Sequence, residues 1–389
     1  PSQKVMDAWN LRSPYSAVGI YISGNSRYCS DRYQPNLSRT WVETNASHGW
    51  RFIPIHVGYQ SPCFRNNPSS RVQKRLMSST VSTARSQAAS DAAEGIAALR
   101  EYGFGAGDVH YLDLEWYSRT TTCDRAVLEF IDVWTEKLHA AGFKSGVYSS
   151  GSAAIAVLDS AKASGRSMTY PDHLWIAWTN QVANTDGGPY VRDTLWANHQ
   201  RIHQYHNNVS ASYGGHGVTI DKNFLDVGTG SVATTEPKPC GVRMSFSSYP
   251  RLHQGDTSDE VHALECLLEE RGYNVTLNGQ FGSTTTDAIN AFRRSLGWGP
   301  TAGHTTNPTW TALLSAGSRP RVLKRGSVGE AVWRLQRALT TAGMSVTING
   351  VFDSRTESAV RSYRTANGLA NYGTVESSVW SLLQRGALG

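Results

Sequence analysis

An internal repeat restricts the last part of this chain to small helical modules. Twelve positions of residues 252–292 recur in residues 323–363 at a constant offset of 71, and Trp310 recurs as Trp380 at an offset of 70. Each copy predicts a helix with Val, Leu and Leu at i, i+3 and i+7, a turn through Asn-Gly, and a second helix that carries Ala and an aromatic residue. We therefore expect two small all-α modules of three helices each.

Residues 1–228 alternate short β-rich runs with helical stretches. Seven segments are strand candidates: Ala17 to Ser23, Arg51 to Tyr59, Val109 to Trp116, Lys144 to Ser150, His173 to Thr179, Arg201 to Asn207 and Val218 to Phe224. Helices are expected at Thr83 to Tyr102 and Arg125 to Ala141. The alternation indicates a parallel sheet, and a TIM-like (β/α)8 barrel is the best-populated α/β fold near this size. Because Pro1 to Trp9 is predicted to be helical, we expect the missing strand to be the first, upstream of the numbered chain.

Length and a change of composition set the expected boundaries. A chain of 389 residues exceeds what one hydrophobic core usually serves. Residues 229–239 are small and Pro-containing without an apolar period, which is typical of a linker. We expect a barrel over residues 1–228, a linker over 229–239, and modules over 240–317 and 318–389.

The third of these strand candidates carries two acids, Asp113 and Glu115, on alternate positions. Residues i and i+2 of a strand project from the same face, so both side chains would point into one space. Repulsion and partial desolvation would raise the pKa of at least one of them, leaving a protonated acid beside a carboxylate. Glycosidic bond hydrolysis needs such a pair. The alternative is a strand end whose acids meet Lys or Arg on a neighbouring loop.

In barrels of this kind the carboxyl ends of the strands carry the chemistry. The other candidate site residues share that expected position: Tyr21, His56, Tyr59, Tyr148, Trp178, Gln204, His206 and Asp221. Acids, amides and aromatic rings that converge on one rim are typical of a carbohydrate site.

The repeated segment resembles the peptidoglycan-binding modules of the first type, over nearly all of residues 240–389. Their pattern includes Val-x-x-Leu-Gln-x-x-Leu and Asn-Gly-x-Phe-Gly/Asp, and Gln336 and Asp353 fit it in the second unit. The first unit departs from it, with Glu265 in place of Gln. It also carries Cys240 and Cys266, a variant that we expect to be disulfide-linked.

Two families resemble residues 1–228. Four segments follow the order seen in lysozymes of glycoside hydrolase family 25: Gly146 to Ser149, Leu174 to Trp178, His203 to Tyr205 and Ile220 to Asn223. Three others look more like the glycoside-hydrolase-like domains of unknown-function family 1906: Ala17 to Ile22, Trp50 to Tyr59 and Tyr111 to Trp116.

The resemblance implies roles for three acids. Glu115 matches the proton donor, Asp113 its partner carboxylate, and Asp221 the acid of the last strand. Aromatic and amide side chains near them would position a sugar or hold the acids. In both families the first strand ends in a further Asp, so we expect a third site carboxylate outside the numbering.

Charge and cysteine usage bear on partner and compartment. Residues 319–389 hold ten Lys plus Arg against four Asp plus Glu, which favours a polyanionic partner such as an acidic wall polymer or nucleic acid. The five cysteines never form Cys-x-x-Cys and favour disulfides in an oxidising compartment. With the resemblances, we expect a secreted, cell-wall-associated monomer without cofactor or membrane span. Its partner would be peptidoglycan or another bacterial cell-wall glycan, not nucleic acid.

The leading hypothesis is a lysozyme-like cell-wall glycan hydrolase. One rival is a barrel that binds wall glycan without cutting it. A weaker rival is a zinc amidase, because His199 and His203 have the i, i+4 spacing of helical zinc ligands. The run that follows alternates like a strand, which would separate these two histidines, and we expect no metal.

Overall fold

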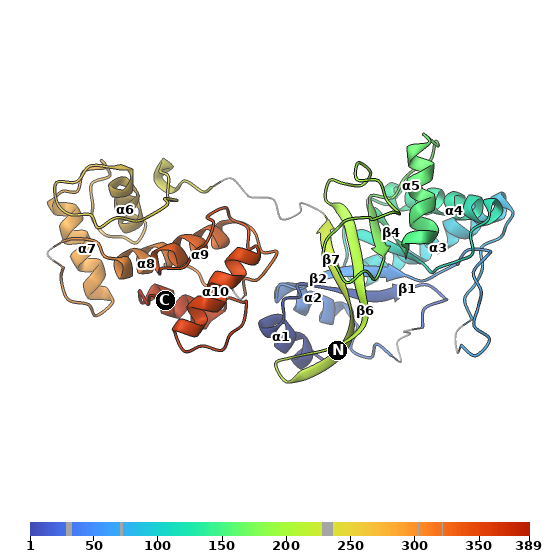
Figure 1. Ribbon diagram of the computed structural model, residues 1–389, viewed down its shortest axis with the longest axis horizontal. Helices are drawn as coiled ribbons and strands as arrows, with labels where there is room; N and C mark the ends of the chain where they lie inside the picture. The colour runs from blue at the N-terminus through green and yellow to red at the C-terminus, as the bar shows by residue number, and fades with distance from the viewer. Residues whose placement is uncertain (29–32, 71–72, 228–235, 302, 321) are drawn as a thin grey trace. The chain divides into compact units, whose positions relative to one another are not determined.

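The structure is a computed structural model that describes residues 1–28, 33–70, 73–227, 236–301, 303–320 and 322–389. It divides into two compact units, one formed by residues 1–7 with 17–230 and the other by residues 8–16 with 231–389. Figure 1 shows the sheet in the first unit and a set of short helices in the second. None of the described helices combines the length and the apolar character needed to cross a bilayer.

The first unit is built on one seven-stranded sheet, and all seven predicted strands are present. The strands are β1 (Ala17–Ser23), β2 (Arg51–His56), β3 (Val109–Leu114), β4 (Lys144–Ser150), β5 (His173–Ala177), β6 (Gln200–Tyr213) and β7 (His216–Val227). They lie in chain order, and each neighbouring pair from β1 to β6 is parallel. The carboxyl ends of six strands therefore meet at one edge of the sheet, as the alternation predicted.

The last strand differs from the prediction because β7 runs antiparallel to β6. Only Gly214 and Gly215 separate the two strands, and both have positive φ, 60° and 80°. Two such residues make a tight hairpin, whereas parallel strands need a crossover of a dozen or more residues. In the described residues β1 and β7 each have one neighbour in the sheet, so the architecture is a curled mixed sheet and a closed eight-stranded barrel is not seen.

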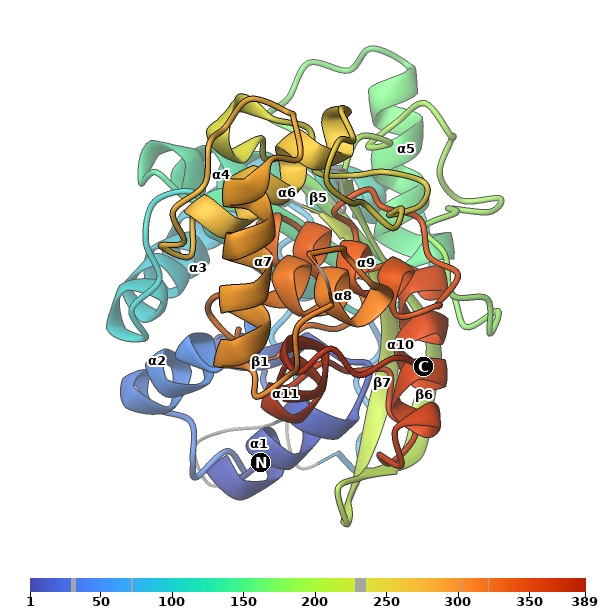
Figure 2. The same ribbon diagram turned by 90° about the vertical axis from the view of Figure 1, so that its left-hand side faces the viewer.

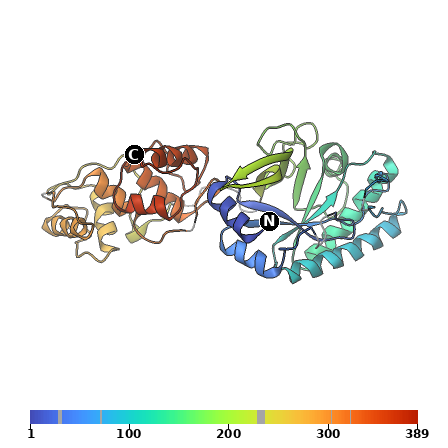
Figure 3. The same cartoon turned by 90° about the horizontal axis from the view of Figure 1, so that it is seen from below.

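Alternation along the strands separates two faces of the sheet. The inner face carries a cluster that includes Ile55, Tyr111, Trp175 and Ile202. Helices cover the outer face, where the ring of His110 packs against Trp134 with 5.5 Å between centroids. In Figure 3 these helices, cyan and teal, lie along one side of the sheet. The helices of this unit are α1 (Gln3–Arg12), α2 (Arg39–Ser47), α3 (Val81–Glu101), α4 (Thr121–Ala140) and α5 (Ala156–Ala163), with a π-helical turn at Gly151–Ile155.

The second unit consists of two repeats of three helices. They are α6 (Asp259–Glu269), α7 (Ser283–Ser295) and α8 (Asn307–Ser315), then α9 (Glu330–Thr341), α10 (Ser354–Ala366) and α11 (Ser377–Gln384), after a 3₁₀ turn at Pro239–Gly241. Buried residues of both repeats form one continuous hydrophobic cluster. Helices α8 and α9 lie side by side (Figure 2), and the hydroxyls of Thr311 and Thr341 hydrogen-bond between them at 2.8 Å.

The repeats preserve one buried contact with different chemistry. In the second, Oε1 of Gln336 accepts from the backbone N–H groups of Asn349 and Gly350 at 2.9 and 2.8 Å. In the first, Oε2 of Glu265 accepts from the equivalent N–H groups of residues 278 and 279 at 2.9 and 2.8 Å. Each side chain thus holds the Asn-Gly turn of its own repeat. The predicted disulfide between Cys240 and Cys266 is confirmed.

Candidate functional site

The acid pair lies where β3 ends at the carboxyl edge of the sheet. Asp113 shares the inner face with Tyr111, and Glu115 follows directly after the strand. The two acids have different surroundings, because Asp113 is 6% exposed and the side chain of Glu115 is 41% exposed. Oδ1 of Asp113 is buried and has no hydrogen-bond partner among the described residues. A buried, unsatisfied carboxyl oxygen is costly in a folded protein, which marks this position as a candidate for ligand contact.

Gln60, a residue that the sequence analysis did not single out, fixes the backbone between the two acids. Its Nε2 donates to the main-chain oxygen of Asp113 at 2.8 Å, and its Oε1 accepts from the N–H of Glu115 at 2.8 Å. Gln60 is itself fully buried, and its own N–H and C=O pair with Arg75 and Met77 at 2.7 Å each. The loop that follows β2 is therefore bonded to the end of β3. A single Gln in a loop gives no sequence pattern by which this role could be found.

The same loop brings a lysine to the site. Nζ of Lys74 lies 3.5 Å from Oε1 of Glu115. The backbone of Lys74 is held by Asn66, whose Oδ1 accepts at 2.7 Å and whose Nδ2 donates to the lysine carbonyl at 2.9 Å. A cation thus pairs with one of the two acids, while the described residues provide no ion pair to Asp113.

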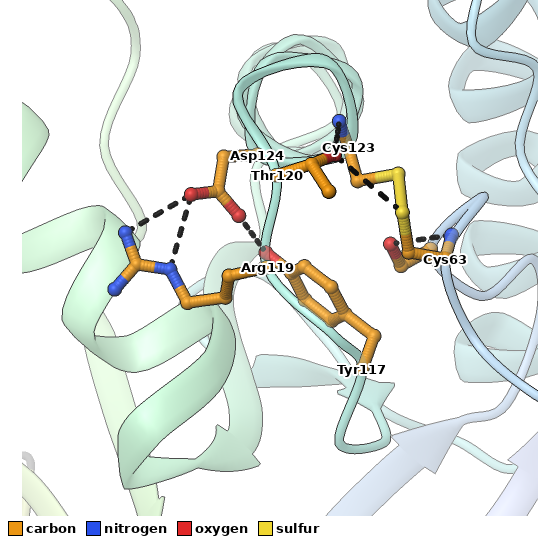
Figure 4. The surroundings of a disulfide bond; sticks show 7 residues. Cys63, Tyr117, Arg119, Thr120, Cys123 and Asp124 are labelled. Carbon is orange, nitrogen blue, oxygen red and sulfur yellow. Dashed lines mark hydrogen bonds and ion pairs between the residues drawn. A yellow bond between two sulfur atoms is a disulfide. The ribbon is translucent and has the colours of Figure 1, made fainter.

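A disulfide ties this loop to the first turn of α4. It joins Cys63 and Cys123, a pairing that the sequence left open (Figure 4). Thr120 caps the helix, with its Oγ1 accepting from the N–H of Cys123 at 3.2 Å. The segment between β3 and α4 is held as well, because the hydroxyl of Tyr117 donates to Asp124 at 3.0 Å. Cys29 lies outside the described residues.

The environment of Asp113 determines where the pair keeps its proton. Burial raises the pKa of Asp113 most, the charge of Glu115 raises it further, and Lys74 opposes both, so that the pKa lies at about 8. At neutral pH Asp113 therefore holds a proton beside the more exposed Glu115. The family resemblance makes Glu115 the proton donor, whereas the raised pKa lies at Asp113, because that side chain is the buried one of the two.

The third predicted acid, Asp221, is linked by hydrogen bonds to Tyr148, which neighbours the pair on the next strand. Tyr148 lies opposite Asp113 in the register of β3 and β4. Its hydroxyl donates to Oε1 of Gln204 at 3.0 Å, and Nε2 of Gln204 donates to Oδ2 of Asp221 at 3.2 Å. The backbone N–H of Asn208 donates to the other oxygen of Asp221 at 2.8 Å. Strands β4, β6 and β7 thus each place one polar side chain at the same edge as β3.

Electrostatics shows that these groups converge on Tyr148. Burial raises the pKa of Tyr148 well above its usual range, and the negative charges of Asp113, Glu115 and Asp221 raise it further, as does Tyr21. Asp113, Glu115, Asp221 and Tyr21 therefore each lie within electrostatic reach of Tyr148. The structure brings together the three predicted acids and three of the predicted neighbours, which are Tyr21, Tyr148 and Gln204.

His56 does not join this group. It lies on the outer face of β2 and is fully buried, with its Nδ1 hydrogen-bonded to Ser23 Oγ at 2.8 Å and its Nε2 3.2 Å from Oδ2 of Asp91. Its ring also packs against Trp134 of α4. Neighbouring residues of a strand face opposite sides, so the inward side chain of β2 is Ile55, and the expectation for His56 is corrected.

Three other candidates have partners of their own. The indole of Trp178 stacks on His203 at 5.7 Å, and a Cβ on Gly188 would collide with it. The ring of Tyr59 has the guanidinium of Arg75 over it at 5.1 Å. His206 is half-buried on β6, opposite Lys222. The structure therefore gives Trp178 and Tyr59 packing contacts in place of an open ring face.

Trp116 is an aromatic side chain that the sequence analysis did not assign to the site. It follows Glu115 directly and is 55% exposed, the most exposed large hydrophobic side chain among the described residues. An exposed indole on the residue after Glu115 suits contact with a sugar ring, because flat rings match the apolar faces of pyranoses.

The histidines of the zinc hypothesis have other contacts. Both ring nitrogens of His203 lie against main-chain oxygens, those of Trp178 at 2.7 Å and Asn184 at 2.9 Å. Nδ1 of His199 lies 2.6 Å from Oδ1 of Asp226. Across the described ranges, three or more His, Cys, Asp or Glu side chains nowhere gather as a metal would require.

Comparison with solved structures finds distant similarity. An uncharacterized protein of B. stearothermophilus is 13% identical over 58% of this chain and 92% of its own, with a TM-score of 0.38. The catalytic domain of endolysin ply40 from bacteriophage P40 of Listeria monocytogenes is 15% identical over 57% and 88%, with a TM-score of 0.34. The autolysin LytC of Streptococcus pneumoniae is 14% identical over 57% and 42%, also at 0.34. No curated protein matches the chain.

Family models match both parts of the chain. Residues 257–313 and 328–383 each match a putative peptidoglycan binding domain, in agreement with the repeat. Residues 7–225, more than half of the chain, match the Rv2525c-like, glycoside hydrolase-like domain. The chain therefore belongs to the family of Rv2525c-like, glycoside hydrolase-like proteins and carries two peptidoglycan-binding modules after that domain.

Proposed function

We propose that this protein hydrolyses glycosidic bonds in peptidoglycan or a related cell-wall glycan, as a lysozyme-like enzyme. The observation that carries the proposal is the acid pair at the end of β3, where a buried Asp113 with a raised pKa lies beside the exposed Glu115. Such a pair enters a reaction with one proton and one negative charge, which acid-assisted cleavage of an acetal requires. The family and the two modules support a wall glycan as substrate.

The two acids take different roles in this proposal. Glu115 is the acid that a saccharide can reach, so we assign it the contact with the glycosidic oxygen. Asp113 stores the shared proton of the pair at rest. As the bond from the anomeric carbon to the leaving oxygen breaks, its electron pair stays on that oxygen, and the proton passes from Asp113 to Glu115 and from Glu115 to the oxygen. A water molecule then adds to the anomeric carbon and returns a proton to the acids.

The remaining polar groups hold this pair and its substrate. Asp221, fixed by Gln204 and the N–H of Asn208, contributes negative charge that favours an oxocarbenium-like transition state. Tyr148, opposite Asp113 in the register of β3 and β4, donates to the Gln204 that holds this acid. Trp116 offers its exposed indole to a sugar ring.

We also propose that binding and chemistry are divided along the chain. Residues 1–228 would carry the reaction, and residues 240–317 and 318–389 would hold the enzyme on insoluble wall, with 229–239 as the linker. Two disulfides and two peptidoglycan-binding modules support a secreted, wall-associated enzyme.

Reducing-end release from purified wall tests the proposal. Wild type is expected to release reducing sugars, and Glu115→Gln is expected to lower the rate at least about a hundredfold while binding to wall is retained. Equal release by the two proteins would refute the assignment.

One observation favours a second candidate, a domain that binds wall glycan without cutting it. Lys74 pairs with Glu115 at 3.5 Å and so offsets part of the charge of the acid pair. On this candidate, wild type binds wall saccharides and releases no reducing ends. The same assay therefore separates the two.

A further inference from the structure

The loop between β2 and α3 has an unusual charge composition for a segment beside three acids. Residues 57–80 contain Arg65, Arg71, Lys74 and Arg75 and no Asp or Glu. Its described part meets the carboxyl edge of the sheet through Gln60, which bonds the backbone of both acids of β3. The acids alone would repel an anionic ligand. A positively charged loop beside them offsets that repulsion, so that the site can bind an anion.

Among the described cations of this loop, Lys74 pairs with an acid of the site, and its backbone is fixed by contacts outside the acid pair. Asn66 bonds both backbone groups of Lys74, and the next residue, Arg75, pairs with the backbone of Gln60. The disulfide from Cys63 to α4 closes the same loop. The ammonium group is therefore presented by a preorganised loop, which lowers the entropy cost of binding a ligand there.

The contact between Lys74 and Glu115 is loose enough that the lysine ammonium group can also bind a ligand. Charge-assisted N–H···O bonds are about 2.7–2.9 Å long, and this pair is 3.5 Å apart. Both side chains keep access to solvent, at 19% for Lys74 and 41% for Glu115. Beside them the buried Oδ1 of Asp113 lacks a partner among the described residues, an independent sign that a polar ligand group completes the site.

We propose that Lys74 is a specificity-determining residue that binds a negatively charged substituent, a carboxylate or a phosphate, on the saccharide at the Asp113–Glu115 site. The proposal rests on the proposed function in that it places a glycan at this edge. It adds that the preferred glycan is anionic. The sugar ring lies toward Trp116, a hydroxyl or amide of the sugar meets Asp113, and the anionic substituent meets Nζ of Lys74.

The experiment compares three tetrasaccharides of one backbone with the full-length protein. One alternates N-acetylglucosamine with N-acetylmuramic acid and carries carboxylates, one is neutral tetraacetylchitotetraose, and one is that neutral saccharide phosphorylated at its terminal 6-hydroxyl. Dissociation constants from calorimetry and kcat/KM from reducing-end release are measured for wild type, Lys74→Gln, Lys74→Arg and Arg65→Gln. Arg65 is an exposed cation of the same loop and serves as the matched control.

Wild type, Lys74→Arg and Arg65→Gln are expected to prefer an anionic saccharide over the neutral one by about tenfold, and Lys74→Gln to lose that preference. The loss is expected in KM and in the dissociation constant more than in kcat. A preference for the carboxylated or for the phosphorylated saccharide identifies the substituent. The modules are the same in all four proteins, so binding by them cancels in the comparison.

Three results would each overturn the assignment of Lys74: no preference in wild type, a preference that persists in Lys74→Gln, or a preference that disappears equally in Arg65→Gln. The experiment also distinguishes failure of the Lys74 proposal from failure of the proposed hydrolysis. Hydrolysis of all three saccharides at equal efficiency refutes the role of Lys74 alone. Selective, Lys74-dependent binding without release of reducing ends supports that role and refutes the hydrolysis.

Discussion

The side-chain amide of Gln60 is bonded to the backbone of Asp113, with Nε2 2.8 Å from the main-chain oxygen, in a fully buried position. The other end of the same amide accepts from Glu115, so one side chain sets the spacing of the acid pair. The catalytic geometry proposed here thus depends on a residue outside β3.

Gln60→Met tests that dependence. The substitution keeps the volume but leaves a buried carbonyl and a buried N–H without partners, which is expected to lower the free energy of unfolding by about 2–4 kcal/mol. Activity is expected to fall more than the folded fraction does, because the acids lose their spacing. Urea unfolding and reducing-end release measure the two effects. Unchanged turnover in the folded variant would show that Gln60 does not position the acids.

The raised pKa of Asp113 predicts a pH dependence of stability with a definite sign. Its folded pKa of about 8 lies above the ordinary value of 3.8 for an Asp side chain, so between these values the unfolded chain has lost a proton that the folded chain keeps. The free energy of unfolding therefore falls as pH rises from about 4 to about 8. Asp113→Asn removes this term, so the variant is expected to equal wild type near pH 4 and to exceed it by a few kcal/mol near pH 8.

Other titrating groups do not affect this comparison. Burial lowers the pKa of His110 to about 3, for example, but His110 is present in both proteins and its contribution cancels. A difference between wild type and Asp113→Asn that stays constant from pH 4 to pH 8 would show that Asp113 is not protonated in the folded protein.

The proposed reaction also uses the proton that Asp113 holds. We therefore expect kcat/KM of wild type to decline as pH rises through about 8, where Asp113 loses that proton.

The two disulfides are expected to have different effects on activity. Replacing Cys63 and Cys123 by Ser releases the loop that carries Gln60 and Lys74, and should reduce both stability, by about 2–4 kcal/mol, and turnover of soluble saccharides. Replacing Cys240 and Cys266 by Ser is the matched control, since that bond lies within the first repeat. The control is expected to lose stability and keep turnover. Equal loss of turnover in both pairs would contradict a special role for the loop.

The repeats offer a reciprocal pair of substitutions. Nε2 of Gln336 donates to the main-chain oxygen of Val351 at 2.8 Å and to Thr356 Oγ1 at 3.0 Å. In Gln336→Glu a carboxylate oxygen replaces the amide group that donates to this carbonyl. The loss of that hydrogen bond and the repulsion between the two oxygens should lower the free energy of unfolding by about 1–3 kcal/mol. Glu265→Gln keeps an acceptor for the Asn-Gly turn and should cost less than about 1 kcal/mol. Calorimetric unfolding of the two variants would contradict this account if Glu265→Gln proved the more damaging.

Much of the fold was predictable because it follows from periodicity. All seven strands were identified from short β-rich runs that alternate with helical stretches, and the offset of 71 identified the repeated modules. The direction of β7 was predicted wrongly although a signal existed. Gly214-Gly215 between two polar-apolar alternating runs is a hairpin signature, and it outweighs the general rule for strand-helix alternation.

The candidate site was predictable where residues lie on strands or directly after them. Asp113, Tyr148 and Gln204 were identified from their place at strand ends. His56 was misplaced because β2 is buried on both faces, so hydropathy does not reveal which residues point inward. Gln60 and Lys74 reach the site through a loop whose path depends on a disulfide and on long-range hydrogen bonds. No local pattern encodes such a path.

The most direct test is hydrolysis of a soluble wall tetrasaccharide in heavy-oxygen water, followed by mass analysis of the fragments. Wild type is predicted to place one heavy oxygen at the anomeric carbon of each new reducing end, and Glu115→Gln to yield fewer than about one hundredth as many labelled ends. Fragments without that label, or equal labelling by the two proteins, would contradict the account.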